Sequence, residues 1–274
     1  MKNLLFSLAL LISIVSFGQT AEEYFRSGID KCRSGEYGQA ISDFSNSIQL
    51  YSDKTDFYNK ADAYYNRATV KVIMSMDYNG AIADLTKAIE LDPNYARLYY
   101  QRAVFRQALQ DFNGSLIDYN KLLTLSINSS LKKKEVMVGA SVSADDNPKR
   151  FRLDNLSLTD IRVLSYNNIG TIKQIFKDFR GSISDFNKAI DINPNDAELY
   201  YNKAISYEGL KDFNKAISNY NKAVELNPNY TSVYINRSIL KEKLGDLKGA
   251  CADGKLAANL GHTESVNWVS SNCN

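Results

Sequence analysis

The hexapeptide "DFNKAI" occurs at Asp185–Ile190 and again at Asp212–Ile217, and the relation between the two copies decides the fold. The copies start 27 residues apart, but the flanking sequence repeats at another interval. "AIDINPND" and "AVELNPNY" place Pro194 and Pro228 34 residues apart. Three tyrosines keep the same step: Tyr166, Tyr200 and Tyr234. The period is therefore 34 residues, and the interval of 27 is one period less about two helical turns, which bring the same helix face round again.

Each period contains two helical patterns. "AELYYNKAISYEGL" (Ala197–Leu210) and "FNKAISNYNKAVEL" (Phe213–Leu226) both carry apolar residues at helical spacing. Asp212 is placed to accept backbone N–H bonds at the start of the second helix, as an N-cap does. Pro228 cannot continue that helix, so it ends the unit. We expect each period to form a helical hairpin.

This pattern resembles the tetratricopeptide repeat, whose 34-residue unit is a helix-turn-helix. In that family, one helix carries a large and a small residue at fixed positions, and the other carries two alanines around an aromatic residue. The unit starting at Ala197 has the matching residues Tyr200, Ala204, Ala216, Tyr220, Ala223 and Pro228. Further units start near Ala21, Ala61, Ala96, Val163 and Thr231. The last one departs from the pattern, with Gly254 in place of the aromatic residue.

The resemblance implies an all-α fold, a right-handed superhelical solenoid of about six helix-turn-helix units with a C-terminal capping helix. Residues 19–129 are predicted to hold units one to three, residues 163–262 units four to six, and residues 263–274 the cap. The stretch 130–162 is close to one period long but lacks the repeat pattern. It is predicted to be an insert or linker between two stacks, with a solvated loop, a binding element and a degenerate helical unit all left open.

The C-terminal segment is expected to cover the last repeat, because the end of a solenoid exposes an apolar face. Val266, Trp268 and Val269 are its expected apolar anchors. If the chain turns back near Gly261 and His262, an antiparallel hairpin brings Cys251 and Cys273 together, so we expect a disulfide there. The third cysteine, Cys32, is then left as a thiol in the first helix.

The first residues predict a signal peptide rather than part of the fold. Lys2 is followed by an apolar run from Leu4 to Phe17, and Ser16 and Gly18 are small residues at cleavage-site spacing. The run is short against the ~20 residues that a membrane-spanning helix needs. We therefore expect residues 1–18 to be removed and the mature chain to be exported, to the periplasm or to the cell surface and beyond, without a membrane span.

Composition and motifs argue against an enzyme. The net charge is +2 and the chain has one histidine, His262, so neither a nucleic-acid-binding basic stripe nor a histidine-based metal or catalytic centre is indicated. Glycine-rich phosphate loops, HExxH and CxxC motifs are missing from the sequence. We predict no catalytic residues, no metal, no cofactor and no nucleic-acid partner.

The resemblance implies that first helices line a groove for a peptide or protein partner. Carried over position by position, it nominates Tyr65, Asn66, Tyr100, Gln101, Asn167, Asn168, Tyr201, Asn202 and Asn236 as groove residues. At a further groove position it places Thr69, Val104, Thr171, Ile205 and Ile239. The amides either bind the backbone of an extended partner or merely reflect the repeat consensus. The predicted function is a non-catalytic scaffold for protein–protein interaction. The alternatives are a glycan- or small-ligand-binding module and a structural accessory subunit of an envelope or secretion assembly.

Overall fold

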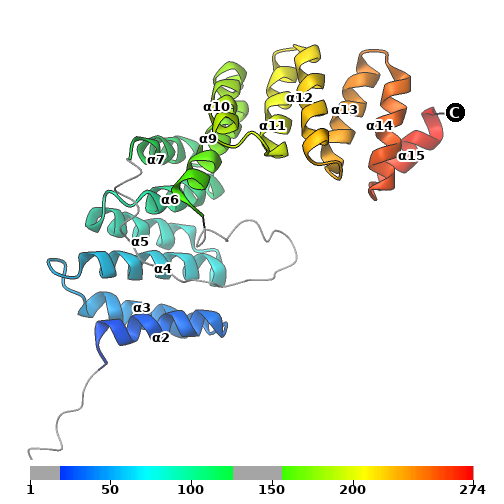
Figure 1. The fold of residues 1–274 in the computed structure, drawn as a ribbon. Coiled ribbons are helices and arrows are strands. Elements are labelled where there is room, and N and C mark those ends of the chain that lie inside the picture. The colour runs from blue at the N-terminus through cyan, green and yellow to red at the C-terminus, as the bar shows by residue number, and fades with distance from the viewer. Residues whose placement is uncertain (1–18, 126–155, 274) are drawn as a thin grey trace, which may run out of the picture. The chain divides into compact units, whose positions relative to one another are not determined.

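The computed structural model describes residues 19–125 and 156–273, and this part of the chain forms α-helices and no strands. The predicted all-α repeat fold is confirmed. The predicted signal peptide (1–18) and residues 130–155 of the predicted insert (130–162) lie outside the described residues. Figure 1 shows the helices in chain order, coloured from blue to red. None of the described helices is long and apolar enough to cross a membrane.

The chain divides into two compact units. The helices of the first unit are α2 (Ala21–Arg33), α3 (Tyr37–Leu50), α4 (Phe57–Ser75), α5 (Tyr78–Leu91) and α6 (Ala96–Ala108). The helices of the second are α7 (Phe112–Thr124), α9 (Leu158–Ile175), α10 (Phe179–Ile192), α11 (Ala197–Gly209), α12 (Phe213–Leu226), α13 (Thr231–Lys243), α14 (Leu247–Asn259) and α15 (Thr263–Asn272).

Consecutive helices pair as the period predicts: α2 with α3, α4 with α5, α9 with α10, α11 with α12, and α13 with α14. The boundary between the two units falls at the turn between α6 and α7, and α7 packs against α9. Helix α9 begins at Leu158, before the predicted start at Val163, because Ser157 and Asp160 form a capping box there. The end of the predicted insert is therefore helical.

Aspartates fix where the second helices begin. The Asp212 side chain accepts a hydrogen bond from the Lys215 backbone N–H, which confirms the predicted cap. Asp178 and Asp246 act in the same way at α10 and α14, and Asp77 does so at α5. Each cap satisfies a backbone donor that has no partner inside its own helix.

The turn inside each hairpin requires one residue in the left-handed backbone region. Gly35 and Gly245 hold this place with φ of 79° and 84°, at no steric cost. Gln110, Lys177 and Lys211 hold the same place in other hairpins, with φ of 61°, 60° and 60°. These three residues adopt a backbone conformation that residues other than glycine disfavour.

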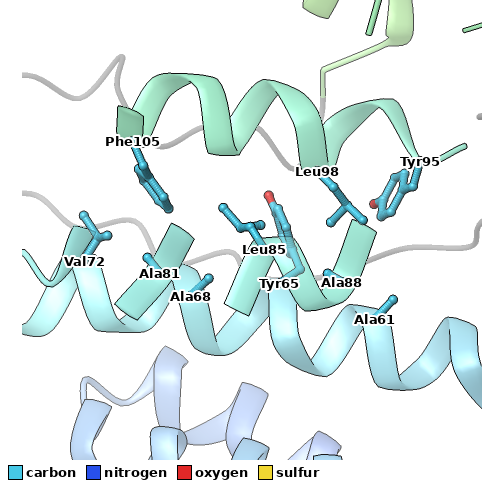
Figure 2. Close-up of a cluster of buried hydrophobic side chains, with 10 residues drawn as sticks. All are labelled: Ala61, Tyr65, Ala68, Val72, Ala81, Leu85, Ala88, Tyr95, Leu98 and Phe105. Atoms are coloured by element: carbon cyan, nitrogen blue, oxygen red, sulfur yellow. The ribbon is translucent and has the colours of Figure 1, made fainter. Parts of the chain in front are cut away.

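Small and large side chains alternate in the core of the first unit. Ala61, Ala68, Ala81 and Ala88 are fully buried where α4 meets α5, while Leu85 fills the space beside them. Leu98 and Phe105 of α6 close this cluster from the next hairpin (Figure 2). The second unit repeats the arrangement, with Ala204, Ala216, Tyr220, Ala223, Val233 and Leu240 all at most 1% exposed. Within each unit, side chains of one hairpin thus complete the apolar cluster of the hairpin before it.

In several hairpins, a buried aspartate on the second helix forms ion pairs with basic side chains of the first helix. Asp84 of α5 accepts two hydrogen bonds from Arg67 of α4, at 2.9 and 2.6 Å, and lies 2.8 Å from Lys71 Nζ. Asp253 of α14 makes the same contacts with Arg237 and Lys241 of α13. One further hairpin pairs Asp185 with Lys173 at 2.5 Å.

The hairpin of α11 and α12 departs from this pattern. Asn219 stands where the other hairpins have the aspartate, one period before Asp253. Lys203 of α11 is half-buried, and no ion pair is recorded for it among the described residues. Burial lowers the pKa of the Lys203 ammonium, because its charge loses water.

The capping helix α15 packs against α14. A Cβ atom at Gly254 would lie 3.1 Å from Trp268 and 3.0 Å from Val269, so these side chains occupy the space beside the glycine. This explains why the last repeat carries Gly254 where others carry an aromatic residue. Val266 is 47% exposed and does not anchor the cap, contrary to prediction. Cys251 and Cys273 are bonded, with a sulfur–sulfur distance of 2.05 Å, while Cys32 is a buried free thiol.

Candidate functional site

Two adjoining cavities open on the first helices of the second unit, and both are lined by Ile239 of α13. The larger has a volume of about 460 Å³ and lies between α11 and α13; its lining residues are Phe179, Ile205, Glu208, Gly209, Asn236 and Ile239. The smaller, of about 190 Å³, lies between α13 and α15; it is lined by Ile235, Ser238, Ile239, Glu242, His262, Glu264, Ser265 and Trp268. We call the two together the α13 groove.

The floor of the α13 groove is apolar. The Ile239 side chain is 59% exposed, although it lies among other apolar lining residues. Gly209 allows the Phe179 ring to approach closely, since a Cβ atom at this position would lie 2.5 Å from it. Any larger residue at Gly209 would displace the ring that forms one wall of the larger cavity.

The charged groups of the α13 groove are acidic. Glu208 lies at the α11 side, whereas Glu242 and Glu264 line the part next to the cap. Among the lining residues of the two cavities, all within the described residues 156–273, there is no lysine or arginine. The pKa of Glu264 is lowered by its own backbone N–H, by the Thr263 hydroxyl and by His262, so this carboxylate is ionised at neutral pH.

The cap supplies one wall through its first residues. The His262 ring accepts the Ser265 backbone N–H through Nδ1 at 3.3 Å, and its Nε2 lies 3.1 Å from Glu264. His262 is therefore the N-cap of α15. This contact fixes the start of α15 beside the smaller cavity.

Tyr201 and Asn236, two of the predicted groove residues, lie together at the larger cavity. The Asn236 amide donates to the Tyr201 hydroxyl at 3.0 Å and lines the cavity. The Tyr201 ring packs against Tyr220 and Tyr230, with ring centroids 6.0 and 5.1 Å away. Burial raises the pKa of Tyr201, so its hydroxyl stays protonated at neutral pH.

The predicted amides of this unit connect neighbouring repeats. Asn202 of α11 donates to Asn167 of α9 at 2.9 Å, and Asn168 donates to the Tyr119 hydroxyl of α7 at 2.8 Å. With the Asn236–Tyr201 bond, these contacts use the amide N–H groups inside the protein. Asn236 Oδ1 accepts no hydrogen bond recorded within residues 156–273, so it is the amide group that the site offers to a ligand.

The predicted groove residues of the first unit are buried. Tyr65 is 2% exposed and lies inside the cluster with Leu85 and Leu98 (Figure 2). Asn66 is fully buried and donates to the Asp62 carbonyl, and its Oδ1 has no hydrogen-bond partner among the described residues. Tyr100 and Gln101 are 6% and 2% exposed. None of these four is available on an open surface, which corrects the expectation for them.

Several lining residues were not predicted. Glu208, Glu242, Trp268 and His262 come from a helix end or from the cap, where repeat positions say little about spatial neighbours. Ile205 and Ile239 could be nominated as groove residues from the sequence, since they occupy the same repeat position one period apart. Within residues 19–125 and 156–273, no group of three His, Cys, Asp or Glu side chains is placed to hold a metal ion.

Comparison with known proteins places these repeats in one family. The tetratricopeptide repeat matches residues 163–196 and 197–230, and a TPR repeat matches residues 77–110. Human serine/threonine-protein phosphatase 5 is 32% identical over 93 residues, which are 34% of this chain and 18% of that protein. RNA polymerase II-associated protein 3 of Xenopus tropicalis is 41% identical over 59 residues, 22% of this chain and 9% of that protein. The chain therefore matches less than a third of either relative.

Solved structures share the fold at low sequence identity. pilF of Pseudomonas aeruginosa has a TM-score of 0.61 at 15% identity, covering 92% of this chain and 97% of the other. MamA of Desulfovibrio magneticus RS-1 has a TM-score of 0.57 at 18% identity, covering 74% and 95%. YrrB, described as a TPR protein with an unusual peptide-binding site, has a TM-score of 0.55 at 14% identity, covering 83% and 97%. With its period of 34 residues, its stacked hairpins and these matches, the chain belongs to the tetratricopeptide repeat family.

Proposed function

We propose that the chain is a non-catalytic interaction scaffold that holds an extended segment of a partner protein in the α13 groove. The observation that carries this proposal is the exposed Ile239 side chain, which belongs to both cavities at once. An exposed isoleucine over two adjoining hollows favours the binding of an apolar side chain, because binding would remove its surface from water.

The polar groups of the groove suit an extended backbone. Asn236 Oδ1 is an unused acceptor at the larger cavity, and an extended peptide offers a backbone N–H at every residue except proline. The groove walls come from α10, α11, α13 and α15, and each of these helices packs against its neighbours in the chain. Such a site is formed before the partner arrives, which limits the ordering that binding requires.

Site-specific photo-cross-linking tests this proposal. A photoreactive residue replaces Ile239 in one variant and Ile117 of α7, which is 67% exposed in the same unit, in a matched control. We expect a discrete cross-linked protein at position 239 that is missing at position 117 and lost when Glu208 and Asn236 are changed to alanine. Cross-links of equal yield at both positions would contradict the groove and favour a structural spacer. Retention on carbohydrate columns that Ile239→Asp abolishes, without protein cross-links, would favour the glycan alternative.

We further propose that the scaffold acts outside the cytoplasm, in the periplasm or at the cell surface. Two observations support this setting: the apolar N-terminal run and the Cys251–Cys273 disulfide, since disulfides persist mainly in oxidising compartments. Cell fractionation with intact-mass measurement tests it. We expect an exported chain whose mass corresponds to a start at Gln19, and a full-length chain in the cytosolic fraction would contradict the proposal.

A further inference from the structure

The carboxylates of the α13 groove have no lysine or arginine partner among residues 156–273, unlike two carboxylates on α12 and at its start. Glu225 pairs with Lys222 at 2.6 Å, and Asp212 pairs with Lys215 at 2.6 Å. Within residues 156–273, no ion pair is recorded for Glu242, and Glu264 has only the His262 contact. The groove therefore carries negative charge that the protein does not neutralise with lysine or arginine.

The cations of α13 are held away from the groove. Arg237 and Lys241 bind Asp253 of α14, and Lys243 Nζ lies 4.9 Å from the ring centre of Phe213. Ile235, Ile239 and Glu242 lie on the groove side of the same helix. Helix α13 thus separates its charges by face: its arginine and lysines stabilise the hairpins, while its glutamate faces the open site.

The acidic groups flank an apolar centre. Glu208 lies on one side of Ile239, in the larger cavity, and Glu242 and Glu264 lie on the other side, with Trp268, in the smaller cavity. A ligand with an anionic tail would place like charges together here, which disfavours binding. A ligand with positive charge on both sides of an apolar group would be matched along the whole groove.

From this charge pattern we infer the class of partner segment: an extended stretch in which an aliphatic or aromatic side chain lies between lysine or arginine side chains. This inference rests on the proposed function, because it names the ligand of the same groove. The apolar side chain occupies the cavities around Ile239, and the flanking cations approach Glu208 on one side and Glu242 with Glu264 on the other. Rim charges of this kind contribute mainly to specificity and to association rate.

Selection from a random peptide library displayed on phage tests the inference with the full exported chain. Wild-type protein and Ile239→Asp are the two baits, and sequences enriched by the wild type alone are synthesised with a fluorescent label. We expect these peptides to carry lysine or arginine on both sides of an apolar residue. Replacing those cations by glutamate should weaken binding by about tenfold in fluorescence anisotropy, since the two exposed ion pairs are each worth up to about fivefold.

Matched variants locate the charge effect. The double variant Glu242→Gln/Glu264→Gln should lose most of the preference for cationic over neutral peptides, whereas Glu225→Gln on α12 should keep it. Enriched peptides that bind with no charge preference, or that favour acidic residues, would overturn the inference while leaving the groove as a peptide site. Failure to enrich any sequence over Ile239→Asp would overturn the proposed function itself.

Discussion

The buried carboxylate of the last hairpin gives a sharp test of how the solenoid is held together. Asp253 is 2% exposed and binds Arg237 through two hydrogen bonds of 2.8 and 2.6 Å, with Lys241 Nζ at 2.8 Å. Arg237 is itself 9% exposed and also donates to Asn221 of α12 at 2.7 Å. Asp253→Asn keeps the shape of the side chain but removes the charge that two enclosed cations share.

We expect Asp253→Asn to lower the free energy of unfolding of this end of the protein by about 2–4 kcal/mol. Removing one partner of a buried ion pair costs about 3–5 kcal/mol, because the remaining charge is left enclosed, and the amide oxygen of the variant retains part of the interaction. The loss should stay local, since each repeat of a solenoid contacts only its neighbours.

The single tryptophan of the chain makes the local effect measurable. Trp268 lies on α15 and packs over Gly254 of α14, so its fluorescence reports on the hairpin that Asp253 holds. Urea unfolding followed by this fluorescence should shift to lower denaturant in Asp253→Asn. Far-UV circular dichroism should show a smaller change, because it averages over all repeats.

A matched control replaces an exposed carboxylate. Glu225 of α12 pairs with Lys222 at 2.6 Å, but its side chain is 66% exposed, so Glu225→Gln should leave the fluorescence transition almost unchanged. If Asp253→Asn moves the fluorescence transition no further than this control does, the buried ion cluster does not stabilise the hairpin, and the reasoning fails.

Three further predictions follow from the hairpins. Asn219→Asp should raise the free energy of unfolding by about 0.5–1 kcal/mol, because it gives half-buried Lys203 the carboxylate partner that the other hairpins have. Urea unfolding should show this gain at pH 7 and its loss at pH 3, where the introduced carboxyl is protonated. No gain at pH 7 would contradict the pairing. Lys211→Gly should raise the free energy of unfolding by up to about 1 kcal/mol, because Lys211 has the left-handed φ of 60° that glycine adopts without strain. Thermal unfolding should show this gain, and the opposite change Gly245→Lys should lower the unfolding temperature. Burial raises the pKa of the Cys32 thiol to about 12. Iodoacetamide at pH 8 should therefore modify this thiol in urea but not in the folded chain. Rapid labelling of the folded protein, detected by mass spectrometry, would refute the burial of Cys32.

Much of the fold follows from the sequence alone. The prolines and tyrosines at intervals of 34 residues gave the period, and the predicted second helix Phe213–Leu226 has the bounds of α12. Asp212 acts as the cap that its place before this helix predicts. These features are local, because helix spacing, caps and breakers act within a few residues along the chain. The recurring aspartates of the ion clusters were also present in the sequence as a periodic signal.

The functional surface could be predicted only in part. Repeat position nominated Tyr65 and Tyr201 as equivalent, yet Tyr65 is buried in the core while Tyr201 is half-buried beside an open cavity. Burial depends on which side chains the neighbouring helices bring close, and those neighbours lie about a full period away in the chain. A position within one repeat does not contain that information.

By itself, the sequence determined the period, the limits of helix α12 and the position of the cap, because each is set by short-range patterns along the chain. The tertiary structure alone decided how the amides are used, since Asn202 meets Asn167 across two repeats. It also decided that Trp268 fills the space beside Gly254, and that the acidic rim surrounds Ile239 at the junction of α11, α13 and α15. The physical reason is that stacking brings together side chains from different repeats, and their contacts define both the core and the groove.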